Sequence, residues 1–200
     1  TLSAGSNYSI VFVSADFSIA PKSITVTADA GQSKVFGAAD PTFTYTSSES
    51  GPTFAGALSR VMGEDVGSYA ITLGTLSAGS NYSITFVPAD FTITAKGITV
   101  TADAKSKVFG AADPVFTYTS SESGVTFTGA VSRVAGEDVG TYAITLGTLS
   151  AGSNYSIGFV SADFAIAPKS ITVTADSGQS KVFGTADPTF TYTSSESGIT

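Results

Sequence analysis

The sequence predicts an all-β protein, a tandem array of small immunoglobulin-like β-sandwich domains of about 73 residues each. Three observations predict it. Long stretches of sequence return at a nearly constant spacing, apolar and polar residues alternate with a period of two, and no segment sustains apolar residues at helical spacing. A content of 42% hydrophobic against 12% charged residues indicates packed cores, and 21 glycines indicate many turns.

The repeat sets the domain boundaries. The opening ten residues (TLSAGSNYSI) return at 75–84 and again at 148–157. A unit of this length suits a small domain with its own core better than one rung of a solenoid. The predicted domains are the C-terminal strands of a truncated repeat (1–22), two full repeats (23–96 and 97–169) and the N-terminal part of a further repeat (170–200). Because the sequence starts and ends within a repeat, we expect it to be a segment of a longer array of repeats.

Within each unit we expect about seven short strands. In the second copy the alternating runs 98–102, 116–119 and 142–146 are rich in Thr, Ile, Val and aromatic residues, and Gly, Asp-Pro or Ser-Gly separates them. A continuous β-helix is the alternative. Its rungs would place strands at a constant interval along the sequence. The predicted strand centres are unevenly spaced, so separate globular units are favoured.

Two local patterns predict turn geometry. The run 63–69 (GEDVGSY), repeated as 136–142 (GEDVGTY), resembles the tyrosine corner of immunoglobulin-like domains, in which the phenol bonds to nearby backbone. The glycine that ends each Lys-Val-Phe-Gly motif (Gly37, Gly110, Gly184) is expected to adopt a positive φ, with the following Asp-Pro completing the turn.

Composition excludes several classes of function. The chain has no Cys, His or Trp and a net charge of −7. Disulfides, thiolate or imidazole zinc sites and Cys or His nucleophiles are therefore excluded, and an enzyme is the last of the hypotheses. An acidic chain is repelled by phosphate, so no nucleic-acid partner is expected. Apolar runs of about four residues are too short for membrane insertion of this segment, which needs ~20.

Carboxylates are the only candidate metal ligands. Calcium takes six to eight oxygens, and no Asp-x-Asp-x-Asp-Gly loop is present. We expect no cofactor and interpret the acidic residues as solvated turn residues, with Arg60 and Arg133 as surface partners of the Glu-Asp turns. Calcium is the alternative. Its candidate ligands lie in turns or near the repeat junctions: Glu64, Asp65, Glu137, Asp138, Asp29, Asp90, Asp103, Asp163 and Asp176.

All three asparagines match the N-glycosylation pattern Asn-x-Ser. They are Asn7, Asn81 and Asn154, each before Tyr-Ser. A turn role is favoured, because Asn follows Ser-Ala-Gly-Ser and tolerates turn geometry.

The order of motifs resembles the MBG domain of the "YGX" type. Each frame runs through Ile-Thr-Val-Thr-Ala-Asp, Lys-Val-Phe-Gly-x-Ala-Asp-Pro, Phe-Thr-Tyr-Thr, Gly-Glu-Asp-Val-Gly-x-Tyr-Ala-Ile and Leu-Ser-Ala-Gly-Ser-Asn-Tyr-Ser-Ile. The tyrosine usual before glycine is here Phe36, Phe109 or Phe183. The resemblance covers the whole chain. It implies mostly-β, glycine-rich modules that occur in tandem in large bacterial surface and secreted adhesins, and it carries over no catalytic residue.

The leading functional hypothesis is therefore a non-catalytic stalk or spacer region of an extracellular or cell-surface bacterial adhesin, whose partners are the neighbouring repeats of the same longer chain. The alternative is a self-assembling filament or matrix protein, in which neighbouring chains complete the partial terminal repeats by strand addition. A carbohydrate- or ice-binding module is a lesser alternative, motivated by outward Thr rows such as Thr25/Thr27.

Overall fold

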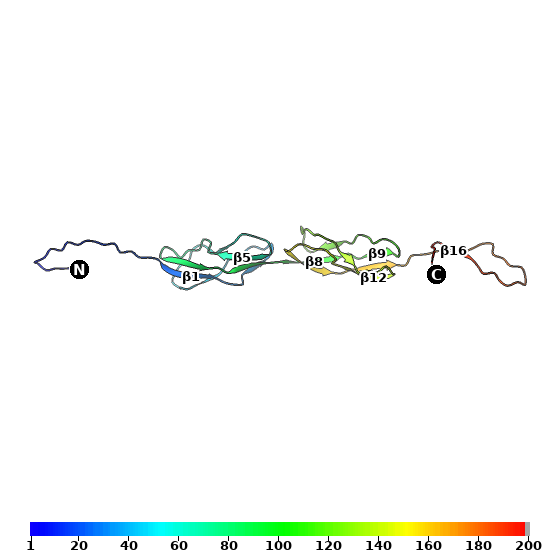
Figure 1. The fold of residues 1–200 in the computed structure, drawn as a ribbon, viewed down its shortest axis with the longest axis horizontal. Helices are drawn as coiled ribbons and strands as arrows, with labels where there is room; N and C mark the ends of the chain where they lie inside the picture. The colour runs from blue at the N-terminus through cyan, green and yellow to red at the C-terminus, as the bar shows by residue number, and fades with distance from the viewer. Residues whose placement is uncertain (199–200) are drawn as a thin grey trace. The chain divides into compact units, whose positions relative to one another are not determined.

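The computed structural model describes residues 1–198, and it confirms the all-β prediction: no helix occurs among these residues. None of the described segments could therefore cross a membrane as a helix. The chain divides into two compact parts, one up to Lys96 and one from Gly97 onward. Their folded portions, strands β1–β7 and β8–β14, are called the first and second unit below (Figure 1).

The first unit contains seven short strands. They are β1 (Lys22–Ala28), β2 (Ser33–Val35), β3 (Tyr45–Ser47), β4 (Ser59–Arg60), β5 (Gly67–Thr72), β6 (Tyr82–Val87) and β7 (Asp90–Thr94).

These strands form two sheets. One has the order β3-β1-β6, with β1 antiparallel to β3 and parallel to β6. The other has the order β2-β7-β5-β4, with β7 parallel to β2 and antiparallel to β5. Two small sheets around one core are compatible with the predicted immunoglobulin-like sandwich, and that finer class stays a prediction.

The core of the first unit draws side chains from both sheets. Alternation along β1 buries Val26 and Ala28, and alternation along β7 buries Phe91 and Ile93. Ile71 of β5 joins them. The Phe91 ring also meets the Phe43 ring edge-on, with 5.2 Å between centroids, a favoured aromatic arrangement.

The second unit repeats this architecture with β8 (Lys96–Ala102), β9 (Lys105–Val108), β10 (Tyr118–Ser120), β11 (Ser132–Arg133), β12 (Gly140–Thr145), β13 (Tyr155–Val160) and β14 (Asp163–Ala167). Its sheets have the orders β10-β8-β13 and β11-β12-β14-β9, and its core includes Val100, Ile144 and Phe164. Only Ala95 separates β7 from β8.

The predicted glycine turns are confirmed. Gly37 has φ 80°, and Gly110 and Gly184 each have φ 81°, values that a residue with a Cβ adopts only under strain.

The partial repeats behave differently from the full ones. Residues 1–21 contain no strand, although the sequence matches β6 and β7. Beyond Ala167, the described residues form only the hairpin β15 (Val173–Ala175) and β16 (Tyr192–Ser194). The side chain of Phe17 is 89% exposed, whereas its counterpart Phe91 is 0% exposed. Strand formation here depends on partner strands, because an isolated strand has nothing against which to bury its apolar face.

Candidate functional site: a repeated ion-pair network

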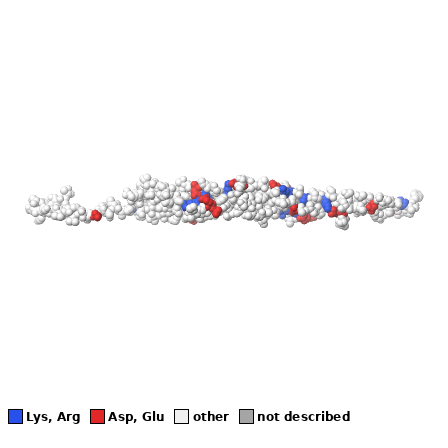
Figure 2. All heavy atoms as spheres, turned by 90° about the horizontal axis from the view of Figure 1, so that it is seen from above, with Lys and Arg blue, Asp and Glu red and all other residues white. Residues whose placement is uncertain are grey.

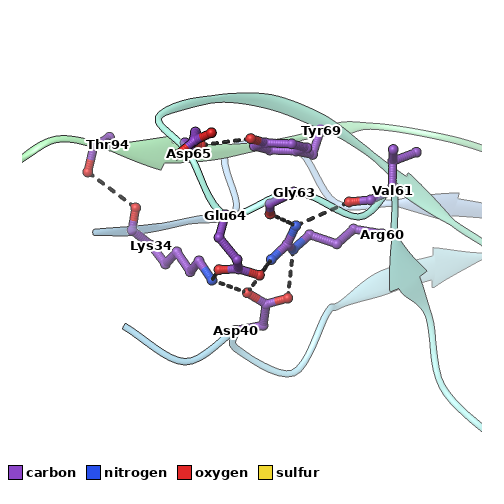
Figure 3. A network of polar contacts seen from close by, with 9 residues as sticks. All are labelled: Lys34, Asp40, Arg60, Val61, Gly63, Glu64, Asp65, Tyr69 and Thr94. Atoms are coloured by element: carbon purple, nitrogen blue, oxygen red, sulfur yellow. Dashed lines mark hydrogen bonds and ion pairs between the residues drawn. The ribbon is translucent and has the colours of Figure 1, made fainter. Parts of the chain in front are cut away.

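The most specific polar feature of each unit is a cluster of four charged side chains, which we call the ion-pair network. In the first unit it consists of Lys34 on β2, Asp40 after β2, Arg60 on β4 and Glu64 after β4 (Figure 3). Two cations and two anions make it formally neutral.

Arg60 is the centre of the network. Its Nε and Nη2 donate to the two carboxylate oxygens of Asp40 at 2.6 and 3.0 Å, a bidentate pair. Nη2 also donates to Glu64, and Nη1 donates to the carbonyl oxygens of Val61 and Gly63. The guanidinium carbon lies 5.4 Å from the centroid of the Phe91 ring. The network is therefore attached directly to the core.

Lys34 completes the network. It lies on β2, at the opposite edge of the sheet from the β4 strand that carries Arg60. Its Nζ is 2.7 Å from Oδ1 of Asp40 and also donates to Glu64. Its side chain is only 4% exposed, so the ammonium depends on these two carboxylates for charge compensation.

The second unit carries the same network. Lys107 and Arg133 contact Asp113 and Glu137 at matching distances, 2.7 Å for Lys107 Nζ to Asp113 and 2.6 Å for Arg133 Nε to Asp113. The guanidinium carbon of Arg133 lies 4.9 Å from the Phe164 ring centroid. The recurrence of the same ion pairs in both copies indicates that the repeat sequence specifies the network.

We expected Arg60 and Arg133 to be surface partners of the Glu-Asp turns, and only the pairing is confirmed. Arg60 and Arg133 do pair with the Glu-Asp turns, through Glu64 and Glu137. They are not surface arginines, since their side chains are only 6% and 7% exposed. The reason is that aromatic rings of the core cover the guanidinium while Asp40 or Asp113 neutralises it.

The electrostatics favour the charged forms throughout. Hydrogen bonds from Arg60, and then from Lys34, lower the pKa of Asp40 to about 2, and Arg133 and Lys107 lower the pKa of Asp113 to about 2. The pKa of Glu64 is lowered chiefly by Lys34, and the pKa of Lys34 is raised chiefly by Asp40.

This shift predicts an acid-sensitive component of stability. A carboxyl whose pKa is lower in the folded state stabilises the fold above its unfolded pKa, and this contribution disappears as the pH falls. For Asp40 the window runs from about pH 4 down to about pH 2. Urea unfolding at a series of pH values measures it. In the Asp40→Asn variant this component should be absent from the first unit, and an equal loss of first-unit stability in the unchanged protein and the variant would contradict the assignment.

The predicted tyrosine corner is present in both units. The Tyr69 hydroxyl donates to the carbonyl oxygen of Asp65 at 2.8 Å, and Tyr142 donates to Asp138 at 2.9 Å. Gly63 lies against the Tyr69 ring, where a Cβ would come within 2.2 Å of Cε1. The corner therefore holds the turn that carries Glu64 into the network.

Removing the Tyr69 hydroxyl tests the corner. Tyr69→Phe keeps the ring and loses one hydrogen bond, so we expect the first unit to lose about 1 kcal/mol of unfolding free energy. Denaturant unfolding measures it. The second unit of the same molecule, with Tyr142 intact, is the control, and an unchanged first unit would show that the ring alone fixes the turn.

The candidate calcium ligands lie apart or already have partners. Glu64 and Glu137 belong to the networks, and the backbone carbonyls of Asp65 and Asp138 accept the tyrosine bonds. Asp103 accepts a bond from Thr117 at 2.6 Å. Asp90 and Asp163 begin β7 and β14, while Asp29 and Asp176 follow β1 and β15. In the described part of the chain, no three carboxylates form a group that could hold a metal ion. That the chain binds no cofactor stays a prediction to be tested, with calcium as the alternative.

We expect the melting temperature to be the same in calcium and in chelator. The network carboxylates are neutralised by Lys and Arg, which a divalent ion would have to displace. Differential scanning calorimetry in both conditions measures this. A calcium-dependent rise would contradict it, because a ligand that binds only the folded state stabilises that state.

The glycosylation candidates lie in turns. Asn81 and Asn154 directly precede β6 and β13, and Asn7 occupies the matching turn of the N-terminal segment. This placement agrees with the turn role, and glycosylation stays the alternative, which intact-mass measurement on native material tests.

The charged surface is sparse. Figure 2 shows blue and red atoms next to one another on the face it presents, with wide areas free of charge between them. Most charges of the two signs are thus mixed, a few are isolated, and no strongly basic or acidic patch occurs on that face.

Sequence reasoning did not find Lys34 or Asp40 as members of a site. A signal was available, since Lys and Asp six residues apart recur in every copy that contains this stretch, as Lys34/Asp40, Lys107/Asp113 and Lys181/Asp187. In the C-terminal partial repeat the pair persists at 2.5 Å, yet the Lys181 side chain is 46% exposed. Burial of this lysine therefore requires the rest of the unit.

The fold and the repeated network define a class: tandem all-β repeat domains with one core each. Residues 24–92 and 98–165 match the family described as MBG domain (YGX type), so the chain belongs to that family. No curated protein and no solved structure matches the chain. The family is generally structural rather than catalytic.

Proposed function

We propose that the chain is a stalk or spacer region of a bacterial cell-surface or secreted adhesin, which extends a binding domain away from the cell. The observation that carries the proposal is the direct succession of two complete MBG units, with the single residue Ala95 between β7 and β8. Each unit closes its own core, so copies add length without needing a partner. The partners in this role are neighbouring repeats of the same longer chain.

Small-angle X-ray scattering on chains of increasing copy number tests the spacer role. One or two further copies of residues 97–169 are inserted after residue 169 of the 200-residue chain. The maximum dimension should grow by a constant increment per copy. An insertion of equal length in a flexible Gly-Ser sequence is the control, since its dimension grows only with the square root of length. Growth indistinguishable from that control would contradict the proposal.

A second candidate function is self-assembly, in which another copy of the chain completes the partial repeats. The observation that favours it is the exposure of side chains whose counterparts are core residues. Ile19 is 87% exposed while Ile93 is 0% exposed, and Phe17 and Phe91 differ in the same way. Strand addition would bury these side chains.

Sedimentation velocity separates the two roles. The 200-residue chain should associate as its concentration rises if copies complete one another, while the chain trimmed to residues 23–169 should stay monomeric. A monomeric full chain at every concentration would exclude self-assembly and leave the spacer role intact.

A further inference from the structure

The way the chain enters and leaves each unit has a mechanical consequence. In the first unit the first strand, β1, pairs in parallel with β6 over six residue pairs, from Lys22↔Tyr82 to Thr27↔Val87. The last strand, β7, pairs in parallel with β2 over three pairs, from Ser33↔Thr92 to Val35↔Thr94. Two chain segments, the entering run 22–35 and the leaving run 82–94, are therefore parallel partners in both sheets.

The two runs cross the unit in the same direction. Within the first unit, Figure 1 shows the blue β1 at the end where the chain enters and the green leaving run ending at the opposite end. Tension applied through the chain therefore pulls the entering run one way and the leaving run the other way, along the strand axis. Parallel-ladder hydrogen bonds lie across this direction and are evenly spaced, so they share the force and cannot be opened one by one.

Side chains oppose the same sliding motion. Val26 of the entering run and Phe91 of the leaving run are both 0% exposed in one core. A shift by one residue would turn every buried side chain of a strand toward the other face. Sliding is therefore coupled to disruption of the core.

The ion-pair network adds a fixed point to the entering run. Lys34 is held by Asp40 and by Glu64, and Glu64 belongs to the turn after β4 rather than to either run. On the leaving run, Thr94 donates its hydroxyl to the carbonyl oxygen of Lys34 at 3.2 Å (Figure 3). In the second unit, β14 pairs in parallel with β9 over four pairs, and Lys107 of β9 has the equivalent partners Asp113 and Glu137.

We propose that each unit is a force-resisting module, which withstands tension applied along the chain by shear of its parallel entering and leaving runs and then gives way in one step. This inference rests on the spacer role and adds a mechanical property to it. A spacer that only adds length needs no such pairing.

Single-molecule force spectroscopy in two pulling directions tests the proposal. The chain has no cysteine, so attachment points can be introduced at will. The shear pair is Pro21→Cys with Gly97→Cys, at positions where the first residue precedes β1 and a Cβ on the second meets open space. The control pair is Pro21→Cys with Ser50→Cys. Because β1 and β3 are antiparallel, this pair pulls adjacent ends apart and opens the ladder one bond at a time.

We expect a several-fold higher rupture force for the shear pair, with the whole unit released in a single event. Forced unfolding reports the unfolding barrier, so both double variants are first shown to have the same equilibrium stability by denaturant unfolding. Equal rupture forces in the two directions, or stepwise opening under shear, would overturn the mechanical proposal. The scattering experiment would still decide the spacer role independently.

Discussion

Replacing Phe91 with alanine is expected to unfold the first unit under conditions in which the second unit stays folded. Phe91 is completely buried, meets Phe43 edge-on and lies under the Arg60 guanidinium. Phe→Ala changes in cores cost about 3–5 kcal/mol. A unit of this size has a total stability of roughly 4–11 kcal/mol, so a large share of it is lost.

Calorimetry and hydrogen exchange measured by mass spectrometry detect this loss. The first unit's transition should fall by on the order of 15 °C or more. Hydrogen exchange should show that the lowered transition belongs to the first unit, because peptides of the two units differ in sequence. Phe17→Ala is the matched control: it occupies the same repeat position but is 89% exposed, and we expect no change. A simultaneous fall of both transitions would contradict independent units.

Replacing Asp40 with asparagine is expected to produce the second largest effect. Asparagine keeps the size but no longer neutralises Lys34 and Arg60, whose side chains are 4% and 6% exposed. Breaking a fully buried pair costs about 3–5 kcal/mol. Asp40 is itself about one-third exposed and Glu64 remains, so we expect a smaller loss of about 1–3 kcal/mol.

Denaturant unfolding of two further variants separates charge from shape. Asp187→Asn removes the same repeat position where its partner Lys181 is 46% exposed, and stability should not change. Lys34→Met combined with Asp40→Asn removes the uncompensated ammonium and should recover part of the loss. If the double variant were less stable than Asp40→Asn alone, charge compensation would not be the reason for the effect.

Much of the fold follows from local sequence. Alternation of Val26 and Ala28 with Thr25 and Thr27 predicts which face of β1 is buried, and burial agrees. The spacing from Gly63 to Tyr69 predicts the corner bond, because donor and acceptor lie four residues apart. Such features depend on steric preference and on neighbours along the chain, which a sequence displays directly.

The ion-pair network was not predictable in the same way. Lys34 and Glu64 are separated by 30 residues, and Asp40 and Arg60 by 20. β2 and β4 are the opposite edge strands of the sheet β2-β7-β5-β4, so only the tertiary course of the segments that follow them, which carry Asp40 and Glu64, brings the four side chains together. Residue type alone suggested solvated surface charges. The covering aromatic rings that exclude water come from other strands.

The sequence by itself determined that this protein is an all-β array of repeated units, where its turns lie and which residues are apolar on alternate positions. Only the tertiary structure decided that the entering and leaving runs are parallel, that the charged residues converge, and that 1–21 forms no strand while its copy 75–95 does. The physical reason is the same in each case. Pairing and burial are properties of two segments together, and the energy of placing Phe91 in a core exists only when the opposing sheet, with Val26 and Ala28 of β1, is there to cover it.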